Sequence, residues 1–433
     1  MKRLSIIVLL AMLLAFTLSA CDLSDLPFFP SEETPEEKPE EKPEETPTHT
    51  HTPAEAVTEN VAYGNCLIAG SYDEVVYCSD PDCGAEISRK QCTAELAAHV
   101  YVDGVCTTCG WYEKYSDGLE YKSNDDGSCS VSGIGRCTDK ELVISPVSPT
   151  GDRVTAIAPF AIKFCSSIES VVIPDSVTSI EASAFFGCTS LRSVEIPDSV
   201  TSIGDGVFFA CGALESVTLP SGITAIPASM FNGCAALKSI EIPESVTMIG
   251  EWAFGDCKSL ESITLPEGLT ILGNSSLRGC TSIKSITVPS AVEGIGEYTF
   301  RDCTSLEEVI LPEGLKTIGD SAFRDCVSLA SVAIPSGVNF FGIYVFGGCT
   351  ALESLVLPEA TARYNEGTFS DCTALKTVVI PKTMTQLGES IFAGCTALTD
   401  VYYTGSEAEW AEISIAAGNE PLTGATVHYN YAE

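Results

Sequence analysis

One pattern of hydrophobic and polar positions repeats along most of the chain. Cysteine recurs every 23 residues, without insertion or deletion, from Cys165 to Cys395. A large apolar residue, usually phenylalanine, lies three positions before each cysteine. The run leucine-x-x-aliphatic-x-aliphatic-proline begins three positions after it, as in residues 191–197. A fixed period of about 20–50 residues is typical of a solenoid built from stacked repeats.

Within a repeat, polar and apolar residues alternate from Ser193 to Ile196, which predicts a short strand with one buried face. Pro197 ends this strand because it has no amide hydrogen to donate. A second apolar pair, Val200 and Ile203, is followed by Gly204, which permits a tight bend. One repeat cannot bury its own apolar face, so we expect repeats to stack at about 4.8 Å per coil.

These repeats resemble the leucine-rich repeats of BspA-like bacterial surface proteins. The resemblance extends over residues 138–433 and is carried by runs such as "IPDSVTSI" and "AFRDCVSL". It implies a curved, β-rich leucine-rich repeat solenoid with short helical or irregular convex segments. It also implies a role in adhesion or surface recognition, and it supplies no catalytic site and no required cofactor.

The repeated cysteine is expected to be a small buried residue with a free thiol. Disulfides between neighbouring coils are the alternative, because their backbones would lie close enough for bonding. Parallel stacking makes these side chains point the same way, and their number, eleven, is odd. Both observations favour free thiols over a disulfide or metal array.

The net charge is −36, with 59 acidic and 23 basic residues. This balance argues against nucleic acid as a partner, because that requires a basic surface. No catalytic motif stands out, and His99 and His428 are isolated from each other in the sequence. We therefore expect a protein that is not an enzyme.

Residues 1–21 have the composition of an export signal, with a basic start and an apolar run. The segment from Leu18 to Cys21 resembles a bacterial lipobox. This resemblance implies cleavage before Cys21 and lipid attachment to its thiol, so that the membrane is contacted through the anchor alone. An ordinary signal peptide is the alternative. Residues 22–60 are rich in proline, glutamate and threonine, which predicts a disordered tether.

Residues 61–112 form a separate cysteine-rich segment. The two pairs Cys78/Cys83 and Cys106/Cys109 resemble a zinc ribbon, which implies one structural zinc ion held by four thiolates. The four-residue gap in the first pair departs from the usual two. Disulfides, which suit an exported chain, and free thiols remain open as alternatives.

The remaining segments are expected to be an N-terminal cap at 113–150, the repeats at 151–399 and a C-terminal cap at 400–433. In the first cap, Cys129 and Cys137 could form a disulfide. Alternatively, Cys137 belongs to an irregular first coil that carries a turn insertion at 145–153.

The outward residues of the predicted strands form two columns. The first is mostly serine, whereas the second changes from polar to apolar beyond Thr287. An exposed apolar stripe often marks a contact surface, although covering by the C-terminal cap is an alternative. Departures from the consensus near 338–368 lie beside it. The predicted contact residues are therefore Ile310, Ala333, Val356, Val379, Phe340, Phe341, Tyr364 and Tyr402.

Together these features predict a lipid-anchored protein at the bacterial cell surface. Its expected partner is an extracellular protein or glycan of the host or of other microbes. Two alternatives belong to other classes: an envelope-structural spacer without a specific ligand, and a metal-scavenging lipoprotein that uses the cysteine-rich segment.

Overall fold

The computed structural model describes residues 115–432 in full, and five earlier strands by their backbone alone. These five strands are β1 (Val57–Ala62), β2 (Ser71–Tyr77), β3 (Glu86–Thr93), β4 (Tyr101–Val102) and β5 (Val105–Cys106). They form two small antiparallel sheets, β1–β2–β3 and β4–β5. The predicted signal, residues 22–56 of the predicted tether and most of the cysteine-rich segment lie outside the described residues. Residues 57–60, predicted as the disordered end of the tether, belong to strand β1 instead, because they pair with β2.

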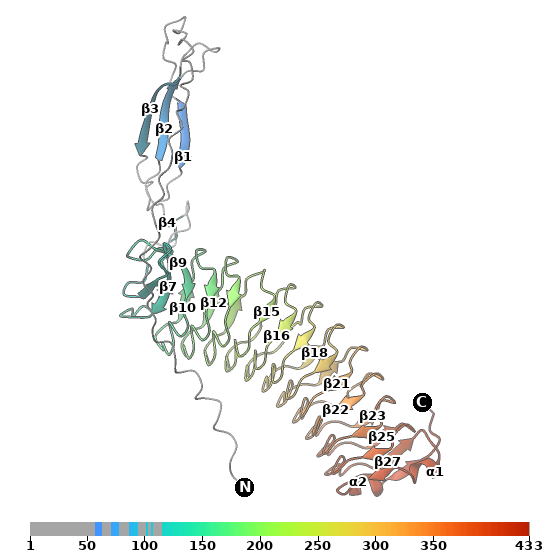
Figure 1. Ribbon diagram of the computed structural model, residues 1–433. Coiled ribbons are helices and arrows are strands. Elements are labelled where there is room, and N and C mark those ends of the chain that lie inside the picture. Colours follow the sequence, from blue (N-terminus) through green and yellow to red (C-terminus); the bar gives the residue numbers. More distant parts are fainter. Residues whose placement is uncertain are drawn as a thin grey trace, which may run out of the picture. The chain divides into compact units, whose positions relative to one another are not determined.

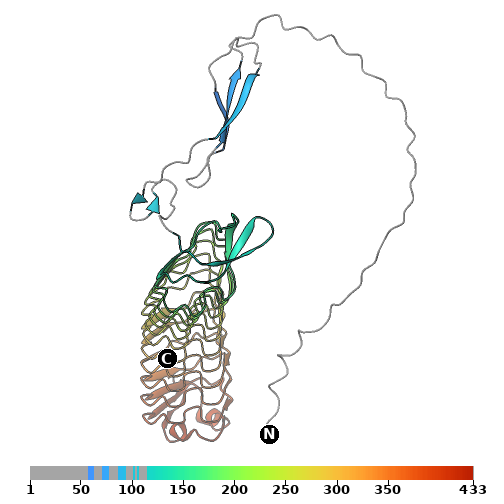
Figure 2. The ribbon, with the colours of Figure 1, turned by 90° about the vertical axis from the view of Figure 1, so that its left-hand side faces the viewer.

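Residues 115–432 form a gently curved stack of coils in chain order, which Figure 1 shows from teal to red and Figure 2 from the side. Two parallel strand ladders run along this stack. Ladder A consists of β8 (Glu141–Val143), β10 (Ser170–Val172), β12 (Ser193–Glu195), β14 (Ser216–Thr218), β18 (Ser285–Thr287), β20 (Glu308–Ile310), β23 (Ser354–Val356), β25 (Thr377–Ile380), β27 (Asp400–Tyr403) and β29 (Thr426–His428).

Ladder B is formed by the second apolar pair of each repeat and begins with a hairpin. Its strands are β6 (Glu120–Ser123), β7 (Ser128–Gly133), β9 (Arg153–Ile157), β11 (Ser179–Ile180), β13 (Ser202–Ile203), β15 (Ala225–Ile226), β16 (Met248–Ile249), β17 (Ile271–Leu272), β19 (Gly294–Ile295), β21 (Thr317–Ile318), β22 (Phe340–Phe341), β24 (Arg363–Tyr364), β26 (Gln386–Leu387) and β28 (Ser414–Ile415).

The 23-residue period of the sequence is also the register of the strands. Ser170 pairs with Ser193 and Ser193 with Ser216, so each side chain lies beside its equivalent in the next coil. In ladder A, Val194 is buried between two exposed neighbours, as the alternation predicts. Regular pairing is interrupted at 239–241, 262–264 and 331–333, but the alternation of burial continues there. The predicted leucine-rich repeat solenoid is thereby confirmed.

A third side of each coil is formed by the six residues before its cysteine, which we call the turn segment. Alternate amides of one turn segment donate hydrogen bonds to the next coil, as from Phe185 N to Val207 O (3.0 Å). The segment also contains residues with a positive φ, such as Ser183 at 56°. The repeats therefore carry irregular turns on this side, and in the described residues α-helix is confined to the C-terminal end.

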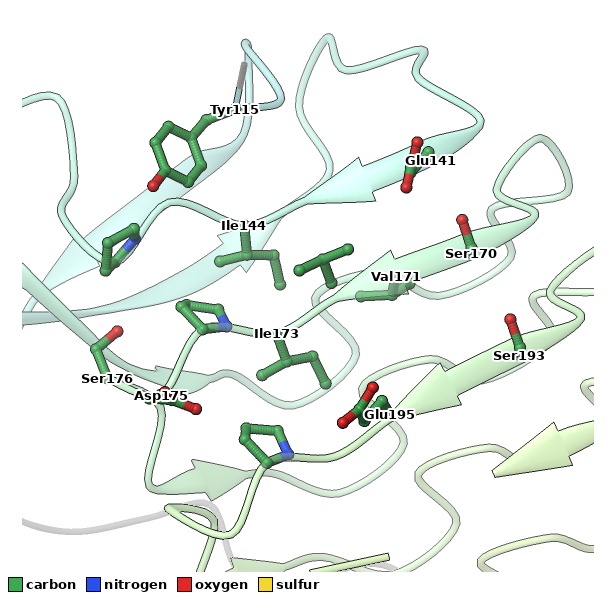
Figure 3. Close-up of a pocket in the computed structure, with 14 residues that line it drawn as sticks. Tyr115, Glu141, Ile144, Ser170, Val171, Ile173, Asp175, Ser176, Ser193 and Glu195 are labelled. Carbon is green, nitrogen blue, oxygen red and sulfur yellow. The ribbon is translucent and has the colours of Figure 1, made fainter. Parts of the chain in front are cut away.

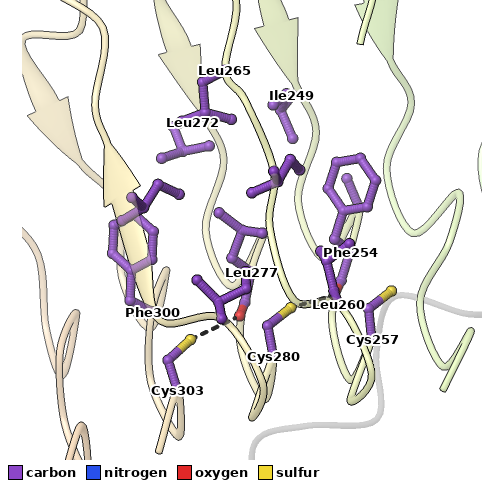
Figure 4. Close-up of a cluster of buried hydrophobic side chains, with 14 of the residues drawn as sticks. Ile249, Phe254, Cys257, Leu260, Leu265, Leu272, Leu277, Cys280, Phe300 and Cys303 are labelled. Carbon is purple, nitrogen blue, oxygen red and sulfur yellow. Dashed lines mark hydrogen bonds between the residues drawn. The ribbon is translucent and has the colours of Figure 1, made fainter. Parts of the chain in front are cut away.

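Phenylalanine forms a continuous stack inside the solenoid. Neighbouring rings from Phe185 to Phe254 and from Phe300 to Phe392 lie 5.1–5.8 Å apart and 4–19° from parallel. Leu277 fills the gap between Phe254 and Phe300 (Figure 4). Stacked aromatic pairs contribute about 0.5–1.5 kcal/mol beyond the burial of their area, so the stack favours one register over all others.

The cysteines lie beside this stack as free thiols, and all from Cys188 to Cys395 are buried. Each thiol donates a hydrogen bond to a carbonyl of the preceding coil, for example from Cys280 Sγ to Phe254 O (3.2 Å; Figure 4). The same carbonyl also accepts from Cys257 N, within its own coil. The prediction of buried free thiols is confirmed for these positions, and the thiol serves as a weak donor between coils as well as a small apolar group. Cys165, in the first regular coil, is only half-buried.

The first coil is longer than the others. Glu141 of β8 pairs with Ser170, 29 residues further on, whereas Ala156 of β9 pairs with Ser179 at the usual distance. The additional residues therefore lie between β8 and β9, in the interval that contains 145–153. Cys129 and Cys137 are both free thiols, so the structure favours the irregular coil over a disulfide.

The last coil is covered by residues of the C-terminal segment. The predicted short helix is present as α1 (Glu407–Trp410), and Ser406 caps it through a reciprocal bond with Glu409. Trp410 packs edge-on against the buried ring of Tyr403, with centroids 5.2 Å apart. A second helix, α2 (Glu420–Thr423), precedes β29. Neither helix is long enough to cross a membrane, and no other helix occurs in the described residues.

The bond between coils can be tested at Cys280. We expect Cys280→Ala to lower the free energy of unfolding by about 1–3 kcal/mol, because it removes a donor and leaves a small void. Cys280→Ser keeps a donor and should lose less. Urea denaturation followed by circular dichroism compares the two variants. Equal losses would contradict a role for the thiol hydrogen.

Burial also makes stability depend on alkaline pH. It raises the pKa of the Cys303 thiol to about 12 and shifts the pKa of Cys280 in the same direction. Above about pH 8.5 the unfolded chain releases thiol protons that the folded chain retains, so stability is full below that pH and falls toward pH 12. We expect the urea midpoint to decrease between pH 8 and pH 10. Cys303→Ser should show a weaker decrease, and a midpoint independent of pH would be evidence against protonated buried thiols.

Candidate functional site

The outward face of ladder A carries the two columns of side chains seen in the sequence. Ser193 and Glu195 represent them in β12, where both are exposed on either side of buried Val194. Strand pairing places Ser193 beside Ser170 and Ser216, and Glu195 beside Val172 and Thr218. The columns are thus continuous rows along the solenoid, and the ladder holds them at a fixed spacing.

The N-terminal half of this face is hollowed and polar. One hollow of about 620 Å³ lies over β8, β10 and β12, and its lining includes Tyr115, Glu141, Ser170, Ser193 and Glu195. Figure 3 shows Glu141, Ser170 and Ser193 side by side on successive strands. A second hollow of about 610 Å³ lies further along the same face, over residues 216–244. Serine hydroxyls and carboxylates give both hollows hydrogen-bonding groups beside the apolar side chains that also line them.

The C-terminal half of the same face is apolar. Ile310 and Val356 are each about half exposed, at 51% and 50%, and Ala333 is exposed between them. Val379 pairs with Val356 and is half-buried, and Tyr402 pairs with Val379. The five predicted contact residues in this column therefore form one row. At Ile310 and Val356 this row is exposed, so no described part of the C-terminal segment covers it there.

The other three predicted contact residues belong to ladder B. Phe340 is exposed there, in β22. Phe341 and Tyr364 are 1% and 0% exposed, and their rings lie 4.8 Å apart in the core. Their prediction as surface contacts is wrong, because the irregular sequence at these positions replaces one buried aliphatic residue by a larger buried ring. The alternation of side chains in the sequence could have shown this, because it places Phe341 and Tyr364 at the buried position of their strands.

The apolar row ends in a cluster that the sequence analysis did not identify. His428 pairs with Tyr402 across β27 and β29, and their rings stack 4.8 Å apart. His428 Nε2 lies 2.7 Å from Asp400 Oδ1, and this hydrogen bond lowers the pKa of the Asp400 carboxyl. The ring of Tyr431 also packs against Tyr402, with centroids 4.8 Å apart. His428 is distant from the other histidines in sequence, but it is not isolated in the fold.

The predicted zinc ligands lie outside the part of the chain whose side chains are described. Cys78, Cys83 and Cys109 are not described, and Cys106 is known only as part of the backbone of β5. The predicted lipid-attachment residue, Cys21, is not described either. Among the described side chains, no group of three or more histidine, cysteine or carboxylate residues could hold a metal ion.

Comparison with known proteins identifies the repeats. The sequence profile of the BspA type leucine rich repeat region matches residues 155–284 and 270–399, in six copies. This match covers more than half of the chain. The chain belongs to the BspA-type leucine-rich repeat family.

Solved structures of bacterial leucine-rich repeat proteins are similar to this BspA-type chain. One from Bacteroides ovatus is 24% identical, with a TM-score of 0.47, and the match covers 73% of this chain and all of that one. A leucine rich cell surface protein from Faecalibacterium prausnitzii is 26% identical, with a TM-score of 0.44 and coverage of 70% and 97%. The pneumococcal vaccine antigen PcpA is 16% identical, with a TM-score of 0.40 and coverage of 73% and 96%. No curated protein matches the chain.

The different burial of two adjacent phenylalanines in the BspA-type repeats gives a direct test of the corrected site. Phe341→Ala should lower the free energy of unfolding by about 3–5 kcal/mol, as expected for a buried ring. Phe340→Ala, at its exposed neighbour, should change it by less than about 1 kcal/mol. Chemical denaturation of both variants measures the difference. Similar values would contradict the assignment of Phe341 to the core.

Proposed function

We propose that this BspA-type protein is a non-enzymatic binding protein of the bacterial cell surface. Its repeats would recognise an extracellular macromolecule through the outward face of ladder A. The observation that supports this most is the exposed apolar row from Ile310 to Tyr402, which lies on a rigid ladder. Family membership supports a binding role in general, whereas the choice of ligand is our inference from the face itself.

The form of the face suits a protein or glycoprotein partner. Its C-terminal half offers apolar contact area, and its N-terminal half offers hydroxyls and carboxylates in two hollows. Apolar contact area combined with hydrogen-bonding groups is the usual composition of a protein interface. Ladder A is held by hydrogen bonds and by the phenylalanine stack, so little conformational entropy would be lost on binding.

We also propose that the protein is exported and anchored through a lipid on Cys21, with residues 22–60 as the tether. This proposal rests on the sequence of the first 21 residues alone. A structural zinc ion at Cys78, Cys83, Cys106 and Cys109 is the corresponding proposal for the cysteine-rich segment. Neither group would take part in recognition by the repeats.

Substitution of Val356 tests the proposed face. We expect Val356→Glu to weaken binding at least about tenfold, because it places a carboxylate in the centre of an apolar contact. Val327→Glu is the matched control, because Val327 is also exposed, at 38%, but lies in the loop after Cys326 and not on ladder A. Both variants should keep the stability of the parent within about 0.5 kcal/mol.

The measurement is binding of the purified protein to a panel of matrix proteins, mucins and glycans at physiological salt. Fixed salt matters because an acidic protein collects basic partners at low ionic strength. Saturable binding that Val356→Glu abolishes and Val327→Glu preserves is the expected result. Binding whose affinity neither substitution alters would place the site elsewhere. A lack of saturable binding to the whole panel would favour an envelope spacer instead.

A further inference from the structure

The turn segments form a second surface, on a different side of each coil from ladder A. Over five successive coils, this surface carries aromatic residues five positions before the cysteine and arginines two positions before it. We call these residues the arginine–aromatic ridge. Its members are Trp252, Arg278, Tyr298, Arg301, Arg324 and Tyr344.

The aromatic residues of the ridge stand where the backbone disfavours them. Trp252, Tyr298 and Tyr344 have φ values of 57°, 58° and 52°, in the left-handed region that large side chains rarely adopt. The two coils between them have serine at the same position, namely Ser275 and Ser321. Smaller residues therefore fit this position, and the aromatic residues recur at every second coil despite the strain. Strain of this kind points to function.

Each aromatic ring holds an arginine. The guanidinium carbons of Arg278 and Arg324 lie 5.0 and 5.1 Å from the ring centroids of Trp252 and Tyr344. The guanidinium of Arg301 lies 5.7 Å from the ring of Tyr298. These are cation–π contacts, which restrict the arginine side chains to one orientation.

The carboxylates of the ridge form ion pairs with the arginines through the Nε atom. Asp302 contacts the Nε atoms of Arg278 and Arg301 at 3.6 and 3.5 Å, and Asp325 contacts Nε of Arg324 at 3.4 Å. The structure shows no hydrogen bond or ion pair for the terminal nitrogens of these three arginines within the described residues. By contrast, Arg192, elsewhere on the solenoid, uses Nη1 to bind Glu215. The three guanidinium groups therefore keep their outer donors available.

The spacing of these donors restricts the ligand. Three of the seven arginines in residues 115–432 occupy this one column, one per coil, with backbone positions about 5 Å apart. Their guanidinium groups lie over rings that belong to alternate coils. The aromatic residues are two coils apart, which corresponds to about 10 Å. An extended glycan has a similar rise per sugar, and its disaccharide repeat has twice that length. In an extended peptide, side chains on one face are about 6.6–6.8 Å apart, which matches neither interval of the ridge.

We propose that the arginine–aromatic ridge binds an anionic glycan with a disaccharide repeat. A preorganised guanidinium group donates two parallel hydrogen bonds to a carboxylate or a sulfate. Each arginine, held over its own ring, would therefore take the acidic group of one disaccharide. Aspartate and glutamate side chains beside the ridge would accept hydrogen bonds from sugar hydroxyls. The net charge of the protein opposes an anion at long range, but salt screens charges beyond about 8 Å under physiological conditions.

The first test measures binding of hyaluronan oligosaccharides, which carry one carboxylate per disaccharide, to the full chain at physiological salt. Chondroitin sulfate carries a sulfate in addition to that carboxylate, so its affinity relative to hyaluronan shows whether the ridge also recognises sulfate. Replacing Arg278, Arg301 and Arg324 together by glutamine should weaken binding at least about tenfold. The matched control replaces Arg153, Arg192 and Arg363 by glutamine, which removes the same charge away from the ridge and should leave binding unchanged.

Four outcomes would overturn the proposal. The first is an equal loss in both triple variants, which would indicate a general effect of charge. The second is equal binding of a neutral chito-oligosaccharide, and the third is displacement by poly-glutamate at the same concentration of carboxylate. Absence of binding to both acidic glycans would overturn it as well. Val356→Glu should leave glycan binding intact. The proposal for the ridge can therefore fail independently of the proposed binding face on ladder A.

A second test examines the aromatic residues, which we assign as positioning residues for the arginines. Tyr298→Ser should weaken glycan binding several-fold, and serine already occupies the equivalent position in the neighbouring coils, so the fold should tolerate it. Tyr298→Phe keeps the ring and should restore affinity. If Tyr298→Ser binds as well as the parent, the ring does not position Arg301.

Discussion

Stacking of identical side chains across a 23-residue step is the constraint on which the rest of this structure depends. A coil has too few apolar residues to form a core, so each one completes its core with its neighbours. Phenylalanine rings stack 5.1–5.8 Å apart, and each cysteine thiol from Cys188 to Cys395 donates to a carbonyl of the preceding coil. Both contacts require equal coil lengths, because a single inserted residue would displace every ring and thiol after it. This explains why eleven cysteines follow one another without an insertion.

The same constraint leaves variation to the outward positions. A residue that points into the stack must match its equivalents in two other coils, whereas an outward residue meets solvent. Differences between coils therefore concentrate on the outer face of ladder A and on the turn segments. The apolar row and the arginine–aromatic ridge are both differences of this kind. They lie on separate sides of the coil, so one solenoid offers two surfaces of unlike chemistry.

The period made the fold predictable, whereas the candidate surfaces were only partly so. Ladder A, its outward columns and the buried thiols all follow from alternation and spacing, because these patterns report directly on burial. Phe341 and Tyr364 were misassigned because a break in the consensus was interpreted as exposure, although both occupy the buried position of their strands. The pairing of His428 with Asp400 joins residues 28 positions apart, across the irregular final coil, where the period no longer predicts neighbours.

The ridge was hidden from the sequence for a different reason. Its arginines and aromatic residues lie at two positions of the repeat, and a contact such as that of Arg278 with Trp252 crosses from one coil to the next. Neither position is distinctive in a single repeat, and serine or glycine occupies the aromatic position in most coils. The backbone supplies the missing information, because a positive φ makes a large ring costly there. An unfavourable residue at three alternate coils argues for a role beyond packing, and the orientation of three arginines is the role that its contacts support.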